Sequence, residues 1–325
     1  MFGTLFDHKN KYTFVLFALL FLIFILMPLL TNNLFLLSVL MTAYIYIIFA
    51  MSWDVFSGYV HLMNFGQALF VGLAGYLTAF LDKFYGVPPI LVLLSSAIFC
   101  GLIGVSVGFL TLRHRGPYFA MITIAFAAVA HESSIMFSKV TGGEEGIPGI
   151  SSLTNSTTGD YYFILITMAI IFLFFLWFTR GRYGLILKGI SQNEDAVLAS
   201  GINTPLIKTI TFALSGALCG IGGSLYAYSI MQVGPTSFSQ SLSTTILIMA
   251  IVGGMGTITG PFVGALILVI LNEQLRTIGE YRLLLYTVLL VAIIFLAPKG
   301  IVSYAGPLGK KIGLLPRQQD KLSNK

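Results

Sequence analysis

Charged residues are scarce in this sequence. Asp, Glu, Lys and Arg make up 9% of the 325 residues, and 57% of the residues are hydrophobic. Soluble domains carry about 25% charged residues, so this balance excludes an ordinary soluble protein. The net charge of +6 does not indicate nucleic-acid binding, because the basic residues lie mostly at the ends of apolar runs rather than in a patch with aromatic residues.

Motifs for catalysis and metal binding are also lacking. The histidines are far apart and show no metal-ligand spacing. Cys100 and Cys219 lie inside apolar runs, which is typical of small buried side chains rather than of a disulfide or a metal pair. No nucleophile motif and no phosphate-binding loop occurs. The sequence therefore predicts no enzyme, no metal site and no cofactor bound by this chain.

Long apolar runs dominate what is present. Ten runs are candidate membrane spans, at residues 12–30, 34–53, 65–81, 89–111, 117–136, 161–179, 207–231, 242–257, 260–276 and 283–297. Since some are marginal, they predict an all-α, polytopic transmembrane bundle with about 8–10 spans. The glycine-rich interruption at 253–261 favours a broken or re-entrant helix, with an ordinary turn as the alternative. We expect a single integral-membrane domain over residues 1–306 and a basic cytoplasmic tail over 307–325.

The distribution of Lys and Arg predicts the orientation. With both termini in the cytoplasm, 14 of the 18 basic residues lie inside and four lie outside, as the positive-inside rule requires. Residues 180–208, hereafter the charged island, then face the cytoplasm. The other long hydrophilic segment, residues 138–160, faces outward, and we expect this acidic, glycine-rich segment to form turns rather than a packed domain.

The charged island carries helix signals in an otherwise apolar chain. Ser191 and Glu194 have the spacing of a capping box, and Glu194 and Asp195 suit the positive end of a helix. Gly201 is a natural terminator and Pro205 prevents continuation, which predicts a helix of about nine residues. This helix either rests on its own bundle or is a coupling element that a partner protein grips.

Polar groups inside the predicted spans are few. Asn64 and Gln67 occur where a pathway could pass between helices, although hydrogen bonds between helices explain them equally well. Asp54 could pair with Arg113 or Arg115, which favours a structural role for this carboxylate. Glycines at four-residue spacing, such as Gly104 with Gly108, predict closely packed helices.

Five stretches, in chain order, resemble motifs of one transport family. They read SGYVHLMNFGQALFVGLAGYLTAFL (57–81), LRHRGPYFAMITIAFA (112–127), TGGEEGIPGI (141–150), ISQNEDAVLASGIN (190–203) and GGMGTITGPFVGA (253–265). Together they are similar to the permease subunits of branched-chain amino-acid ABC importers, a group that includes urea-type permeases. The resemblance spans most of the chain.

The resemblance implies a set of partners. Such a permease lies in a prokaryotic cytoplasmic membrane and forms the pathway with a second, related permease. Cytoplasmic ATPases use the ATP, and an extracytoplasmic solute-binding protein delivers the substrate. Leucine, isoleucine and valine are the expected substrates, and urea or short amides are the alternative. Two alternatives belong to other functional classes: a secondary transporter that works alone, and a polytopic membrane enzyme.

The resemblance also assigns candidate site residues. The charged island becomes the loop that couples to the ATPase, with Ser191, Glu194, Asp195, Ala196 and Gly201 as its candidates. Asp195, Ala196 and Gly201 match the spacing of the family's E-A-A-x-x-x-G element, although the first and third letters differ.

Two further groups complete the candidate site. The outer loop toward the binding protein comprises Gly142, Gly143, Glu144, Glu145 and Gly146. The pathway candidates are Asn64, Gln67 and Tyr118, the last of which ends the R-G-x-Y segment of the family.

Overall fold

The computed structural model describes residues 20–31, 33–112, 116–154, 156–257 and 259–276, together with isolated positions between 285 and 302. Six of its helices are long and apolar enough to cross a membrane: α2 (Leu34–Val60), α3 (Gln67–Tyr85), α4 (Pro89–Thr111), α5 (Pro117–Met136), α7 (Thr157–Arg180) and α10 (Thr204–Ile230). Each of them corresponds to one of the predicted runs. The all-α, polytopic fold class is therefore confirmed.

Shorter elements complete the described part of the chain. They are an apolar helix at Leu20–Leu30, α6 (Ser138–Thr141), α8 (Arg182–Gln192), α9 (Glu194–Ala199), α11 (Gln240–Gly253), α12 (Thr259–Gln274), the strands β1 (Ile147–Pro148) and β2 (Gln232–Val233), and the 3-10 helix η2 (Pro235–Phe238). The run 283–297 is described only at isolated positions, and residues 307–325 lie outside the described residues. The domain boundary at 306 stays a prediction.

The core is built around α2 and α10. In α2, 61% of the apolar window is buried, and α10 packs against α4, α3 and α2. Glycine permits a close approach of α4 and α10, because a Cβ added to Gly104 would lie 2.7 Å from Ala213 Cα across their contact. The prediction that spaced glycines bring helices together is thus confirmed at this contact.

Short polar side chains start several of these helices. The Asn33 side chain accepts hydrogen bonds from the backbone N–H groups of Phe35 and Leu36 at the start of α2. Ser156, Asn203 and Ser239 cap α7, α10 and α11 in the same way. The caps satisfy N–H groups that the first turn leaves without a helical partner, which fixes where each apolar run enters its helix.

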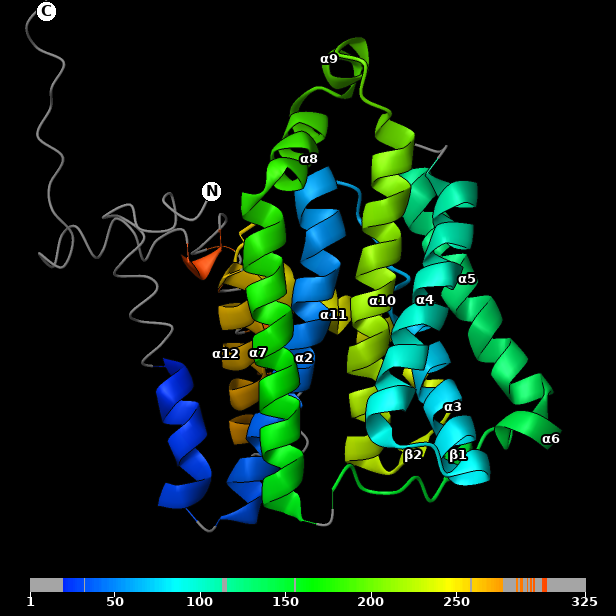
Figure 1. The fold of residues 1–325 in the computed structure, drawn as a ribbon, viewed down its shortest axis with the longest axis vertical. Helices are drawn as coiled ribbons and strands as arrows, with labels where there is room; N and C mark the ends of the chain where they lie inside the picture. Colours follow the sequence, from blue (N-terminus) through cyan, green and yellow to red (C-terminus); the bar gives the residue numbers. More distant parts are fainter. Residues whose placement is uncertain are drawn as a thin grey trace, which may run out of the picture.

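The two hydrophilic segments lie at opposite ends of the molecule. Figure 1 shows α8 and α9 at one end, with α6, β1 and β2 at the other. This arrangement confirms that the charged island and segment 138–160 face opposite ways. We call these the α9 end and the β end.

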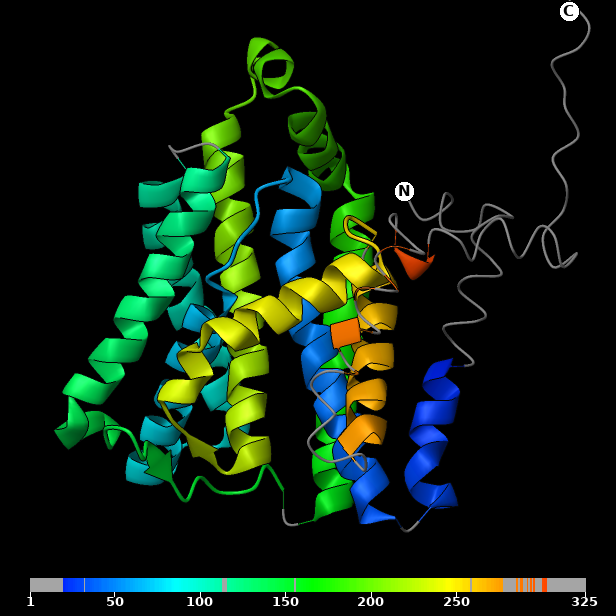
Figure 2. The ribbon, with the colours of Figure 1, turned by 180° about the vertical axis from the view of Figure 1, so that it is seen from behind.

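The glycine-rich interruption breaks a helix. α11 ends at Gly253 and α12 begins at Thr259, with 14 and 16 residues respectively. At 1.5 Å per residue each spans only about 21–24 Å, less than the ~30 Å hydrocarbon core, so neither crosses it alone. Figure 2 shows α11 running obliquely across the bundle and α12 turning back beside α2. The structure thus has a helix break here, as the sequence favoured.

Candidate functional site

The charged island folds as two helices rather than one. α8 comprises Arg182–Gln192 and α9 comprises Glu194–Ala199, so the predicted helix of about nine residues is replaced by one of six, preceded by a helix of 11. Asn193, in an extended conformation, separates them and accepts a hydrogen bond from the Ala196 N–H at 3.0 Å. Asn193, and not Ser191, is therefore the N-cap.

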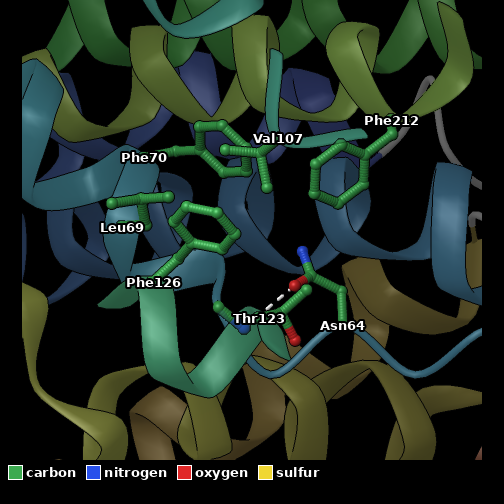
Figure 3. Close-up of a pocket in the computed structure, with 8 residues that line it drawn as sticks. Asn64, Leu69, Phe70, Val107, Thr123, Phe126 and Phe212 are labelled. Carbon is green, nitrogen blue, oxygen red and sulfur yellow. Dashed lines mark hydrogen bonds between the residues drawn. The ribbon is translucent and has the colours of Figure 1, made fainter. Parts of the chain in front are cut away.

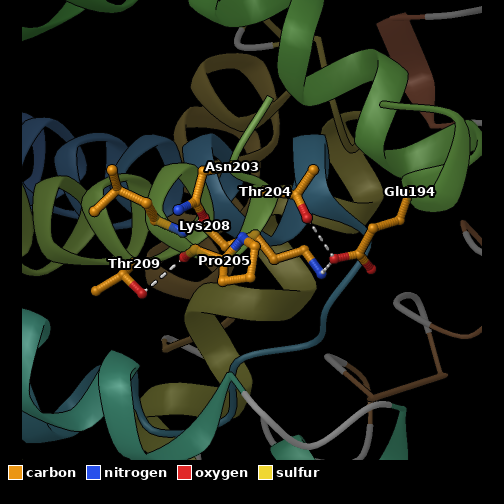
Figure 4. A network of polar contacts seen from close by, with 7 residues as sticks. Glu194, Asn203, Thr204, Pro205, Lys208 and Thr209 are labelled. Atoms are coloured by element: carbon orange, nitrogen blue, oxygen red, sulfur yellow. Dashed lines mark hydrogen bonds and ion pairs between the residues drawn. The ribbon is translucent and has the colours of Figure 1, made fainter. Parts of the chain in front are cut away.

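The predicted capping box is wrong for a physical reason. Ser191 belongs to the last turn of α8, where its hydroxyl donates to the Lys188 carbonyl at 2.8 Å. The carboxylate of Glu194 faces α10 and accepts bonds from Lys208 Nζ at 2.5 Å and from the Thr204 hydroxyl at 3.0 Å (Figure 4). Because the Glu194 carboxylate is bound to Lys208, it does not form the capping box with Ser191.

The Glu194–Lys208 pair anchors α9 to the bundle. The Lys208 side chain is 8% exposed and that of Glu194 is 21% exposed, so the pair is largely shielded from water. Removing one partner of a shielded pair leaves the other charge uncompensated, which costs far more than removing a surface pair. Glu194 is thus an anchor, a role that the sequence pattern did not reveal.

The remaining candidates of the island face outward. Asp195 and Ala196 are exposed on α9, and Gly201 is exposed in the turn behind it. Gly201 has a φ of +85°, the left-handed conformation expected of a helix terminator. Asn203 then caps α10, and Pro205 lies in the first turn of α10. The prediction that Gly201 ends the helix is confirmed.

α8 connects this exposed helix to the bundle. Its buried residues, Gly184, Leu187 and Ile190, face the molecule, and Lys188 Nζ lies 5.9 Å from the centre of the Tyr59 ring of α2. α9 has no buried residue. The two interpretations of the charged island therefore apply to different helices. α8 rests on its own bundle, whereas α9 projects beyond it (Figure 1).

At the β end, the glycines of the outer loop shape a tight turn. Gly142, Gly143 and Gly146 all have positive φ, and a Cβ on Gly146 would lie 2.1 Å from the Val233 carbonyl oxygen. Directly after the turn, β1 pairs with β2 in antiparallel register, Ile147 opposite Val233. Glu144 and Glu145 are exposed at this turn. The expectation of turns rather than a packed domain is confirmed.

Helix α3 clamps the same loop from the side. Asp82 accepts hydrogen bonds from the Ser151 N–H at 2.8 Å and from its hydroxyl at 2.6 Å, and Lys83 Nζ donates to the Pro148 carbonyl at 2.9 Å. We call the turn and the strands the outer platform, residues 142–151 with 232–233. Asp82 and Lys83 were missed in the sequence because their partners lie more than 60 residues away.

Two of the three pathway candidates come together in a buried polar cluster. Asn64 and Gln67 are 1% and 0% exposed, and the Asn64 amide donates to Gln67 Oε1 at 2.9 Å. Gln67 donates to the Ser52 hydroxyl at 2.9 Å, and the Trp53 indole donates to the Asn64 carbonyl at 2.7 Å. The cluster joins α2 to α3 through satisfied hydrogen bonds.

A narrow pocket adjoins this cluster (Figure 3). Asn64 and Gly66 contribute to its wall, and most of the remainder is apolar. The other lining residues are Leu69 and Phe70 of α3, Val107 of α4, Thr123 and Phe126 of α5, and Phe212 of α10. The pocket has no room for a water molecule, so the side chains close it in this conformation. Tyr118 does not join it, because its side chain is 68% exposed on the outer face of α5.

The buried carboxylate of Asp54 supports the helix break. It is 0% exposed and accepts a hydrogen bond from the Gly256 N–H at 2.7 Å. The predicted partners Arg113 and Arg115 lie outside the described residues. Asp54 therefore holds the turn between α11 and α12 against α2. Among the described residues, no group of three or more His, Cys, Asp or Glu could hold a metal ion.

Comparison with known proteins now decides the family. Residues 35–297 match the family described as "Branched-chain amino acid transport system / permease component". The chain belongs to this family. It is a multi-pass membrane transport permease and not an enzyme.

Curated relatives agree with this assignment. The high-affinity branched-chain amino acid transport system permease protein LivM of Escherichia coli K12 is 26% identical over 292 residues, covering 81% of this chain and 69% of LivM. A probable LivM of Methanocaldococcus jannaschii is 23% identical over 326 residues, covering 82% and 94%. The ribose import permease RbsC of E. coli K12 is 36% identical, but over 34% of this chain and 37% of RbsC. No solved structure matches this chain.

Proposed function

We propose that this chain works in a prokaryotic cytoplasmic membrane as one of two permeases in an ATP-driven importer of branched-chain amino acids. The observation that carries the proposal is the projecting helix α9, held at one end of a chain that belongs to a permease family. Two cytoplasmic ATPases hydrolyse the ATP, and this chain binds no cofactor. An extracytoplasmic solute-binding protein supplies the substrate.

The proposed coupling contact is the exposed surface of α9. Asp195 and Ala196 are the first candidates for contact with the ATPase, because both are exposed in the first turn of the helix. Glu194 does not contact the ATPase. Because it is paired with Lys208, it passes a displacement of α9 on to α10. A push on α9 therefore reaches the bundle through the ion pair and through α8.

The outer platform is the proposed landing site for the solute-binding protein. Its backbone is held by β-pairing and by Asp82, so Glu144 and Glu145 occupy defined positions without an ordering cost at contact. Two neighbouring carboxylates favour a basic patch on the arriving protein. With the outer platform outside the cell, we propose that both termini lie in the cytoplasm, on the same side as α9.

The substrate path is proposed to pass the pocket beside Asn64. Most of the pocket wall is apolar, and Asn64 contributes one amide. This composition suits a small substrate that has an aliphatic side chain and a polar end. Gln67 positions Asn64 through their hydrogen bond. Tyr118 is exposed on α5, and we propose that this face of α5 meets the second permease.

Reconstitution tests the function and the substrate together. The chain is purified with its neighbouring permease and ATPase, placed in proteoliposomes, and supplied with ATP and the solute-binding protein. We expect uptake of labelled leucine that unlabelled isoleucine and valine compete away and that urea and ribose leave unchanged. Uptake of urea or of ribose, with no uptake of leucine, would replace the proposed substrate. Ribose is included because RbsC matches about a third of the chain.

A further inference from the structure

Phe238 is a buried aromatic side chain that stands apart from the core. It ends η2 and is 4% exposed. The other buried hydrophobic side chains of the described residues form one connected cluster, to which Phe238 does not belong. A side chain of a close-packed core cannot leave its place unless its neighbours repack. Phe238 can move without that cost, so its burial has a cause other than core packing.

The ring of Phe238 lies on a glycine of α3. A Cβ added to Gly72 would come within 2.3 Å of two ring carbons, so the ring occupies the space that a larger residue would fill. One turn further along α3, the ring of Tyr76 stacks on that of Phe238, with centres 5.7 Å apart and 13° between the planes. The ring is therefore held on α3 by a notch and by one stacked partner.

The short helix η2 packs against both α3 and α5, so it fills the seam between these two helices. Along α3, Leu69, Gly72 and Tyr76 share one face, because residues three and four apart are neighbours on a helix. Leu69 lines the pocket beside Asn64 (Figure 3). From there α3 runs toward the outer platform, which its far end clamps. Phe238 thus lies one helical turn from Leu69, on the outer side of the pocket.

η2 is also the segment that follows the outer platform. β2 ends at Val233, and after Gly234 the helix η2 begins at Pro235. η2 is a single 3-10 turn, whose hydrogen bonds have poorer geometry than those of an α-helix. A binding protein that lands on the platform therefore contacts the chain within a few residues of Phe238.

We propose that Phe238 is the outer gate of the substrate path. With its ring on Gly72, it shuts the pocket beside Asn64 off from the outer surface, and the ring turns out of the seam when the substrate enters. This inference rests on the proposed function, which places the path at that pocket. An aromatic side chain suits the role, because two torsion angles move the whole ring. The core cluster stays intact when the ring moves.

Thiol labelling from outside tests the closure. In the assembled complex with Cys100→Ala and Cys219→Ala, Leu69→Cys places a thiol in the pocket wall one turn from the gate. The probe, applied to spheroplasts, is a methanethiosulfonate with a fixed positive charge that does not cross the bilayer. Because the thiolate is the form that reacts and it needs water, the closed pocket protects this thiol. Glu144→Cys, exposed on the outer platform, reports whether that side faces outward.

Removing the ring should expose the thiol. Because a minor open state is populated at about 10% or less, Phe238→Ala should raise the labelling rate of Leu69→Cys on the order of tenfold. Phe172→Ala is the matched control, since Phe172 is 2% exposed and packs against Phe262, between α7 and α12 and away from the seam. It should leave the rate unchanged. Equal labelling with Phe238→Ala and with Phe172→Ala would overturn the gate.

Gly72→Ala tests the same contact without removing the ring. The added Cβ displaces the ring from its notch, so labelling of Leu69→Cys should again rise. Because the two changes act on one contact, the double variant with Phe238→Ala should label no faster than Phe238→Ala alone. Gly101→Ala on α4 is the control, since its Cβ would meet its nearest atom at an ordinary 3.4 Å. Labelling that rises equally in Gly101→Ala and Gly72→Ala, or in neither, would contradict closure by this ring.

The turning of the ring is tested during import. With Phe238 in place, addition of substrate-loaded binding protein should speed the labelling of Leu69→Cys severalfold, and it should add little in Phe238→Ala. Unchanged labelling in spheroplasts that import leucine would overturn a gate that opens. Failure of Glu144→Cys to label, or of the complex without cysteine to import leucine, would count instead against the proposed orientation and function.

Discussion

The two ends of this molecule present their candidate contacts in opposite ways. At the α9 end, a helix of six residues with no buried residue projects from the bundle, and the shielded Glu194–Lys208 ion pair ties it back to α10. At the β end, the loop is pinned flat by β-pairing and by Asp82 and Lys83. A projecting helix offers several faces to a partner that grips it, whereas a pinned surface offers one face to a partner that lands on it. Changes at the α9 end should therefore have the larger effects.

The largest effect is expected at the turn behind α9. Proline cannot adopt the φ of +85° that Gly201 has, so Gly201→Pro must rebuild the turn at a cost above about 1 kcal/mol. We expect leucine uptake to fall at least about tenfold, because α9 is no longer held in position. Gly201→Asn should retain more uptake, since Asn tolerates the left-handed region. Equal uptake by the two variants, at equal amounts in the membrane, would show that import does not require α9 to be held in position by this turn.

The ion pair offers the next test. Glu194→Gln leaves the Lys208 ammonium without its charged partner, which for a shielded pair costs toward the low end of about 3–5 kcal/mol. Uptake should fall severalfold. Adding Lys208→Met removes the stranded charge, so the double variant should recover part of the loss. A double variant as impaired as the sum of the two single variants would show that the two residues act independently.

Charge reversal on the outer platform should have a smaller effect. The variant Glu144→Lys with Glu145→Lys is expected to raise the concentration of binding protein needed for half-maximal uptake by roughly fivefold at low salt, because surface charges act mainly on encounter rates. The maximal uptake rate should change little, and the difference should shrink in higher salt. Glu132→Lys, an exposed carboxylate on α5, serves as the control. A reduced maximal rate with unchanged half-saturation would contradict a landing site.

The smallest effect is expected at the clamp. Asp82→Asn keeps one acceptor but loses a charged hydrogen bond to Ser151, at a cost of about 1–2 kcal/mol. Hydrogen exchange in residues 147–151 should quicken while uptake changes less than about twofold. Tyr228→Phe, which removes a longer 3.4 Å bond to Asp82, should do less. Unchanged exchange in Asp82→Asn would show that β-pairing alone holds the platform.

Much of the fold could be predicted because membrane spans are encoded locally. The runs 89–111 and 117–136 coincide with α4 and α5, since each apolar stretch must satisfy its backbone within its own helix. The break after Gly253 was likewise visible as glycines and a proline between short runs. α8 was not predicted, because Arg182–Gln192 is only moderately apolar and its buried face depends on packing against α2.

The candidate site was harder to predict because its contacts join distant parts of the chain. The spacing of Ser191 and Glu194 fits a capping box, but Lys208, 14 residues away, holds the carboxylate instead. The spacing of Asn193 to Ala196 fits a cap equally well, and only the structure decides between them. Asp82 and Ser151 are 69 residues apart, and no local pattern relates them. Asn64 and Gln67 were identified because a polar pair inside an apolar chain is conspicuous even without a structure.

Whether α9 binds the ATPase is the most direct test of the proposed coupling. The tagged chain is co-expressed with its neighbouring permease and ATPase and purified from detergent as wild type, Ala196→Arg and Thr158→Arg. Thr158→Arg adds the same side chain to an exposed helical position at the β end. We predict that the ATPase follows wild type and Thr158→Arg and is lost from Ala196→Arg, while the second permease stays with all three. Retention of the ATPase by Ala196→Arg would contradict the assignment of α9 as the docking helix.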